Sequence, residues 1–200
     1  YSNEAGMGSA PNAAATADVS HPAKQGLVQM LAVFIDTLLI CSATALMCLC
    51  SGVVPTEELA GAPYVQKSVE TVLGGFGPIF VTVAMVLFAF TTLLGNLFYV
   101  ENGLAFIHKS VPSKQFMTGF RILCAAVILI GAGLPMAAAW DIADILMAVM
   151  CLINLPACFR LGKVAIDACR DYEAQRKAGK NPVFRAADIG MDPDQLEWWK

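Results

Sequence analysis

Two pairs of polar residues stand inside long apolar stretches of this sequence, where oxygen atoms able to bind a cation are scarce. Asp36 and Thr37 are adjacent in the first stretch. Thr91 and Thr92 are adjacent in the second, about one helical turn after Phe88. Hydroxyl, carboxylate and backbone carbonyl oxygens are hard ligands that suit small hard cations. Thr91, Thr92 and the carbonyl of Phe88 are therefore a candidate cation site, and Asp36 is a candidate for ion or proton handling.

Each of these residues also has a structural alternative. A carboxylate inside a membrane is costly and must face protein, water or an ion, so Asp36 can simply pair with a neighbouring helix. Threonines in membrane helices often bond the carbonyl four residues earlier or a neighbouring helix. The sequence leaves these alternatives open for Asp36 and for the threonine pair.

The elements that carry these residues are four apolar segments, at about 27–54, 78–100, 122–140 and 142–163. A membrane span needs about 20 mostly apolar residues, and each segment approaches or exceeds that length. Composition agrees, with 57% hydrophobic and 14% charged residues against about 25% charged in soluble domains. The sequence predicts an all-α polytopic membrane protein with four transmembrane helices in a lipid bilayer.

Basic residues give the expected orientation. Of the 13 Lys and Arg residues, all but Lys67 fall on one side if the linkers alternate across the membrane, as the positive-inside tendency predicts. Both termini are then cytoplasmic. Residues 1–26 form a cytoplasmic loop with a short helix, and 164–200 form a cytoplasmic helix and a tail whose glycines and prolines predict mobility.

A short helix is expected outside the membrane at about 64–73. Val65, Val69, Val72 and Leu73 recur at helical spacing and give it one apolar face. It is too short to span the bilayer, so we expect it to lie on the outer surface or to fold back over the protein.

The sequence opens without Met in the middle of a polar motif, so we expect it to be the C-terminal part of a longer protein. Its seven cysteines show no CxxC or CxxH spacing and lie in or beside apolar segments, like small core residues. We expect no metal beyond an alkali cation, no organic cofactor and no nucleic-acid partner.

Four stretches together resemble a known family. They are the Ser-Asn-Glu-Ala-Gly-Met-Gly-Ser-Ala-Pro motif at 2–11, the stretch from His21-Pro22 to Gln25-Gly26, Phe34 to Thr37, and Phe90 to Asn96. The sequence is similar in these stretches to the alanine or glycine:cation symporter family, the bacterial and archaeal sodium/alanine symporters. The likeness covers nearly the whole chain, up to about residue 178.

The resemblance implies a five-plus-five inverted-repeat (LeuT-like) transporter fold in the plasma (inner) membrane. The four spans then match core helices seven to ten, and the helix at 64–73 matches an extracellular lid. Thr91, Thr92 and the Phe88 carbonyl occupy the positions of a sodium site, and Asp36 and Thr37 those of a possible second cation or gating site. The substrate carboxylate in such transporters meets broken helices, which are expected in missing N-terminal helices of the same protein, so the substrate ligands stay unknown.

The implied function is cation-coupled symport, with sodium as the expected ion, of a small neutral amino acid such as alanine or glycine by alternating access. Proton coupling stays open. A second reading is a non-transporting membrane scaffold or accessory subunit. An intramembrane enzyme is disfavoured, because His21 and His108 lie in predicted loops without paired zinc-type spacing.

Overall fold

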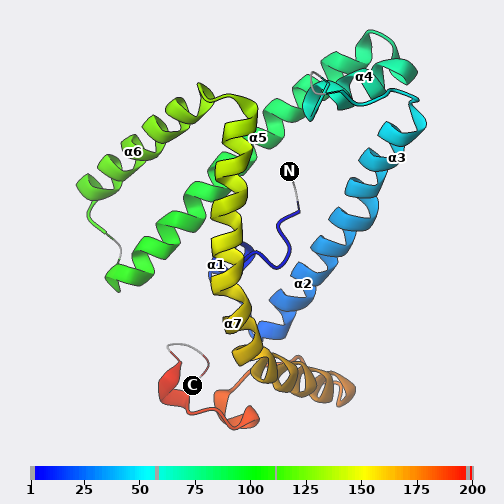
Figure 1. The fold of residues 1–200 in the computed structure, drawn as a ribbon. Coiled ribbons are helices and arrows are strands. Elements are labelled where there is room, and N and C mark those ends of the chain that lie inside the picture. Colours follow the sequence, from blue (N-terminus) through cyan, green and yellow to red (C-terminus); the bar gives the residue numbers. More distant parts are fainter. Residues whose placement is uncertain (1–2, 57–58, 111, 197–198, 200) are drawn as a thin grey trace. The chain divides into compact units, whose positions relative to one another are not determined.

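The computed structural model describes residues 3–56, 59–110, 112–196 and 199, and all regular secondary structure in these ranges is helical. The chain divides into two compact units. One comprises Asn3 with Ala32–Leu104, and the other comprises the described residues of Glu4–Leu31 and Ala105–Lys200. We describe each unit by itself (Figure 1).

The first apolar helix is continuous over Pro22–Cys50 but changes its hydrogen-bond pattern inside. It consists of α2 (Pro22–Ile35), a π-helical segment η1 (Asp36–Cys41) and α3 (Ser42–Cys50). Pro22 suits the first position of a helix, where its missing N–H leaves no bond unmade. The π-helical segment begins at Asp36, and such segments occur frequently at functional sites.

The second apolar helix, α5 (Phe76–His108), has 33 residues and extends beyond the predicted range 78–100. Glu101 and Asn102 lie inside this helix, although they are polar. Backbone hydrogen bonding therefore continues past the end of the apolar pattern from which the range was predicted.

The third and fourth apolar helices are α6 (Lys114–Ala132) and α7 (Met136–Lys177). Ser113 caps α6 by accepting a hydrogen bond from the Phe116 N–H. The predicted third span ran to Trp140, whereas the structure breaks between Ala132 and Met136, at Gly133 to Pro135. Proline lacks an N–H and fits the start of a helix better than its interior, so Pro135 lies next to the boundary.

Helix α7 has 42 residues, or about 63 Å at 1.5 Å per residue. It continues through Pro156 and through the predicted end of the fourth span at Lys163, without a break in assignment. Such a helix is about twice as long as a hydrocarbon layer is thick. Its last turns must therefore extend beyond the bilayer if its apolar part crosses it.

The short helix at the predicted range 64–73 is present as α4 (Ala62–Leu73). It packs against α3 (Figure 1), and the Tyr64 hydroxyl donates to the carbonyl of Val53 at 3.2 Å. Its buried residues are Ser68 and Val69, while Val72 of the predicted apolar face is 76% exposed. The side that α4 buries is thus narrower than its hydropathy pattern indicated.

Three short helices flank these elements. The N-terminal one, α1 (Ala10–Ala14), lies within the range 1–26 where a short helix was expected. The C-terminal tail contains two 3-10 turns, η2 (Ala186–Ile189) and η3 (Pro193–Gln195). Phe184 and Ala186 in the tail are buried, so this part of the tail packs against the protein, in contrast to the mobility expected from its composition.

Candidate functional site

Thr91 and Thr92 lie on α5, on the same helix as Phe88. The Thr91 hydroxyl donates to the carbonyls of Leu87 at 3.1 Å and Phe88 at 3.0 Å. Its proton is therefore committed to its own helix, and its oxygen keeps lone pairs for another partner. The Thr92 hydroxyl makes no hydrogen bond within the part of the chain that the structure describes. The three predicted oxygen ligands are adjacent, and none is consumed by a contact to another helix in the described structure.

Asp36 and Thr37 form the first turn of the π-helical segment. The Asn3 side-chain amide donates to the Thr37 hydroxyl, and the Ser42 hydroxyl donates to the Thr37 carbonyl at 3.2 Å. Asp36 is half-buried, and its carboxylate has no hydrogen bond or ion pair among the described residues. An unpartnered carboxylate beside a fixed hydroxyl can accept a proton or help to bind a cation.

The two predicted residue pairs remain separate. No hydrogen bond between described residues joins Asp36 or Thr37 to Thr91 or Thr92. The structure instead brings Thr37 to Asn3, which belongs to the predicted family motif at 2–11. Sequence reasoning missed this contact because 34 positions separate the two residues.

Asn154 of α7 makes a second contact with the same motif. Its amide donates to the Gly6 carbonyl at 2.9 Å. The backbone at Gly8 has φ +105°, and a Cβ atom there would lie 3.0 Å from the Asn154 Cβ. Only glycine accommodates both this conformation and this approach.

His21 is the centre of a further cluster, which sequence reasoning placed in a loop. Its side chain is fully buried. The Ala23 N–H donates to its Nδ1 at 3.1 Å, so Nε2 carries the proton of the neutral ring and donates to the Asp171 carboxylate at 3.2 Å. The rings of Tyr172 and Phe184 meet the imidazole edge-on, each with centroids 5.2 Å apart.

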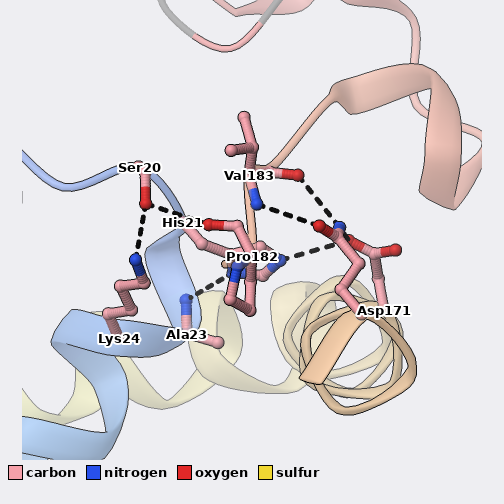
Figure 2. Close-up of polar contacts among 8 residues, drawn as sticks. Ser20, His21, Ala23, Lys24, Asp171, Pro182 and Val183 are labelled. Carbon is pink, nitrogen blue, oxygen red and sulfur yellow. Dashed lines mark hydrogen bonds and ion pairs between the residues drawn. The ribbon is translucent and has the colours of Figure 1, made fainter. Parts of the chain in front are cut away.

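The tail crosses this cluster, and Figure 2 shows Pro182 and Val183 between the start of α2 and the end of α7. Gln175 binds the Val183 backbone twice, with its Nε2 donating to the carbonyl at 2.9 Å and its Oε1 accepting from the N–H at 3.0 Å. The same amide nitrogen donates to Asp171 at 2.8 Å. One glutamine side chain therefore fixes the tail to α7 and orients the carboxylate that binds His21.

The other side of the tail binds the start of α2. The Ser20 hydroxyl donates to the Pro182 carbonyl at 2.9 Å, and the Phe184 N–H donates to the Ser20 carbonyl at 2.9 Å. Lys24 bridges the Ser20 hydroxyl, at 2.7 Å, and the Asn181 amide oxygen, at 2.9 Å.

Both ring nitrogens of His21 have hydrogen-bond partners. This arrangement is typical of a structural histidine and leaves neither nitrogen to bind a ligand.

Side chains that commonly bind transition metals or divalent ions are dispersed in the described part of the chain. Within the described ranges, no three His, Cys, Asp or Glu side chains gather in a way that could hold a metal ion. All seven cysteines there are free thiols.

The exposed surface defines the class of this protein. Four helices are long and apolar enough to cross a membrane, and large side chains on them stay exposed, including Phe159 at 84% and Phe106 at 85%. Soluble proteins rarely expose contiguous apolar surface on this scale. These helices make the chain part of a multi-pass membrane protein.

The particular family follows from comparison with known sequences. A family model described as the sodium:alanine symporter family matches residues 1–186. The chain belongs to this family of membrane transporters, as the resemblance predicted.

Individual relatives agree in class but differ in their described substrates. The amino-acid carrier protein AlsT of Bacillus subtilis is 46% identical over 94% of this chain and 40% of its own length. From the same organism, the probable sodium/glutamine symporter GlnT is 43% identical over 100% of this chain and 41% of its own length. The putative sodium/proton-dependent alanine carrier protein YrbD, also from this organism, is 38% identical over 100% of this chain and 44% of its own length. No solved structure matches the chain significantly. The chain spans about two fifths of the length of these relatives.

Proposed function

We propose that this chain is part of a symporter that couples the entry of a small neutral amino acid, such as alanine or glycine, to the entry of sodium. The observation that carries the proposal is the family match over residues 1–186. The names of two relatives include sodium symport or sodium/proton-dependent carriage. These names support a cation-coupled transporter, and no covalent chemistry is required.

Sodium binds, in this proposal, at the carbonyl of Phe88 and the hydroxyls of Thr91 and Thr92. The hydrogen bonds from Thr91 to Leu87 and Phe88 are those of the structural alternative, and they are compatible with this assignment because they turn the Thr91 proton toward its own helix. A lone pair of the hydroxyl oxygen is then left for an ion. The remaining ligands would come from helices outside this chain.

Asp36 and Thr37 form a second cation or gating site in the same proposal. The π-helical turn, the unpartnered carboxylate and the Asn3–Thr37 hydrogen bond support it. Thr37 lies 15 residues after Pro22, or about 22 Å along the helix at 1.5 Å per residue. Asn3 therefore contacts the middle of the first span, and we place this end of the motif at membrane depth, which differs from the cytoplasmic loop expected for 1–26.

The proposed membrane arrangement keeps the rest of the expected topology. The cytoplasmic side then holds Lys24, the α5–α6 connection and the C-terminal tail. Helix α4, which carries Lys67, forms an extracellular lid. The four apolar helices correspond to helices seven to ten of a five-plus-five inverted-repeat fold. The charge distribution of the sequence supports this orientation.

Transport proceeds by alternating access. Sodium favours the outward-facing arrangement only to the extent that it binds that arrangement more tightly. Amino acid and ion together then permit closure of the lid and opening to the cytoplasm. A membrane potential of 100 mV contributes about 2.3 kcal/mol for each charge moved, which is enough to drive accumulation.

The test is uptake of labelled alanine and glycine by proteoliposomes that contain the full-length protein, with and without an inward sodium gradient. Gradient-dependent accumulation of either amino acid is the expected result. Uptake without any sodium dependence would contradict sodium coupling. The absence of uptake for all small amino acids would favour a scaffold or accessory subunit.

A further inference from the structure

Asn154 lies in the apolar part of α7 and has a specific backbone partner. It stands 18 residues after Met136 and 6 before Arg160, which is about 27 Å and 9 Å along the helix at 1.5 Å per residue. A side-chain amide at such a position is costly in a membrane unless it is hydrogen-bonded. The bond to the Gly6 carbonyl meets this need.

The segment that Asn154 contacts is non-helical. Gly6 and Gly8 have φ of +83° and +105°, a region that side chains other than glycine rarely adopt. Non-helical backbone at membrane depth is tolerated only where it is buried in protein or lines a cavity. An open depression of about 220 Å³ lies on the surface here and is lined by Gly8, Met150, Ile153, Asn154 and Ala157.

We propose that the non-helical Gly6–Gly8 backbone forms part of the substrate-binding region, and that Asn154 is a positioning residue for transport that fixes this backbone. This inference rests on the proposed function. Asn154 acts through the backbone that it holds, because its amide is already occupied by Gly6. Loss of the amide therefore weakens substrate binding as well as turnover.

Kinetics of alanine uptake by reconstituted full-length protein test this role. Asn154→Ala should raise the KM for alanine by about fivefold or more, as expected for the loss of one hydrogen bond. Leu152→Met, at a residue of the same helix that is 69% exposed and does not line this depression, should leave KM unchanged. Asn154→Leu also removes the amide but keeps a side chain of similar size, and it provides the same comparison if the alanine variant does not reach the membrane.

The outcomes separate this proposal from the proposed function. An unchanged KM in both Asn154 variants, with only the amount of membrane protein reduced, would overturn the positioning role and leave a structural one. Wild-type protein without alanine uptake would instead contradict the symport proposal.

A second inference comes from the tail, independently of Asn154. Residues 180–186, which we name the tail strap, bind α7 through Gln175 and the start of α2 through Ser20 and Lys24. Phe184 closes over His21 and is itself 5% exposed. The Trp199 indole donates to the Val19 carbonyl at 3.2 Å, which ties the chain beyond the strap to the same place.

We infer that the tail strap couples the start of α2 to the end of α7, so that these two helix ends move as one body during transport. Direct side-chain contact between the two ends runs through His21, which meets the Asp171 carboxylate and the Tyr172 ring of α7. The strap adds backbone bonds on both sides of the His21–Asp171 pair, at Ser20 and at Gln175. Release of the strap therefore frees the α2 end without removing a residue from the proposed cation site.

Two variants test the strap. Gln175→Ala removes both bonds to Val183 and the bond to Asp171, and Phe184→Ala alters only the tail. Gln175→Ala should accelerate tryptic cleavage after Lys180 and Arg185 by about tenfold, as expected when two hydrogen bonds to the tail are lost. Phe184→Ala should accelerate the same cleavage because it removes a buried ring that packs on His21. The maximal rate of alanine uptake should fall severalfold while its KM is unchanged.

The control is Glu173→Ala on the same helix, where Glu173 and Lys177 form an exposed pair at 3.4 Å. It should alter neither cleavage nor uptake. Faster cleavage with a normal maximal uptake rate would overturn the coupling role, and unchanged cleavage in both strap variants would show that these contacts do not hold the tail.

Discussion

Asp36 and His21 are two titratable side chains with opposite surroundings. The His21 ring is fully buried, with both nitrogens hydrogen-bonded and two aromatic rings against its edges. Asp36 is half-buried without a side-chain partner among the described residues. A satisfied group stabilises the fold, whereas a carboxylate without a partner in an apolar helix is available to a ligand.

Thr92→Ala tests the cation site at the level of one oxygen atom. The sodium concentration that gives half-maximal alanine uptake should rise at least about tenfold, because a hydroxyl ligand is lost without a change in backbone. Thr44→Ala is the matched control, since the Thr44 hydroxyl, among the described residues, bonds only the Ile40 carbonyl of its own helix. Equal sodium dependence in the two variants would show that Thr92 is not a sodium ligand.

His21→Ala should destabilise the protein by about 2–4 kcal/mol, because it opens a cavity and leaves the Ala23 N–H and Asp171 without their partner. Thermal unfolding in detergent measures this loss. His108→Ala is the control, since His108 is exposed and its ring meets the Phe116 ring edge-on without a hydrogen bond among the described residues. A melting temperature equally unaffected in both variants would mean that the His21 cluster contributes no stability.

At the scale of elements, α4 can approach α5 closely because Gly77 has no side chain. A Cβ atom on Gly77 would lie 2.9 Å from the Glu70 nitrogen and the Val69 carbonyl carbon, both backbone atoms of α4. Across the same junction, the Gln66 amide donates to the Thr82 hydroxyl at 2.9 Å. Helix α4 thus packs against the first turns of α5.

Gly77→Ala should therefore displace α4 and destabilise the protein by about 1–3 kcal/mol, the usual range for overpacking. Gly75→Ala, two residues earlier, meets no atom within 4 Å and should be close to neutral. Thermal unfolding and chemical labelling of Lys67 in the two variants give the comparison. Similar stability and labelling in both would show that the contact at Gly77 is not needed.

The elements also show what the sequence could predict. Apolar length predicted four long helices, because a span is a local pattern that one segment carries alone. Two long-range contacts were beyond such reasoning, namely Asn3 with Thr37 and Asn154 with Gly6, which lie 34 and 148 positions apart. The packed tail was missed for the same reason, since its partners at His21 and Ser20 lie far away in the sequence.

The candidate site was predictable only in part. Residue types at 36, 37, 88, 91 and 92 indicated oxygen ligands, but hydropathy cannot show that Asp36 begins a π-helical turn. Nor can it show the direction of the Thr91 proton, which depends on the helix that the structure provides.

For the whole molecule, the charge distribution predicts which ends face which compartment. In a variant without native cysteines, Lys67→Cys should react with a membrane-impermeant thiol reagent in intact cells, because α4 is placed outside. Lys180→Cys should react only after the membrane is permeabilised. Labelling of Lys180→Cys in intact cells would contradict the proposed orientation.

Coupling between ion and amino acid is the central claim, and it must be reciprocal if it is thermodynamic. The most direct measurement is uptake of labelled sodium by proteoliposomes with the full-length protein, driven only by an inward gradient of alanine or glycine. We predict sodium accumulation with one of these amino acids and its loss in Thr92→Ala. An amino-acid gradient that is dissipated through the wild-type protein without moving sodium would contradict sodium-coupled symport.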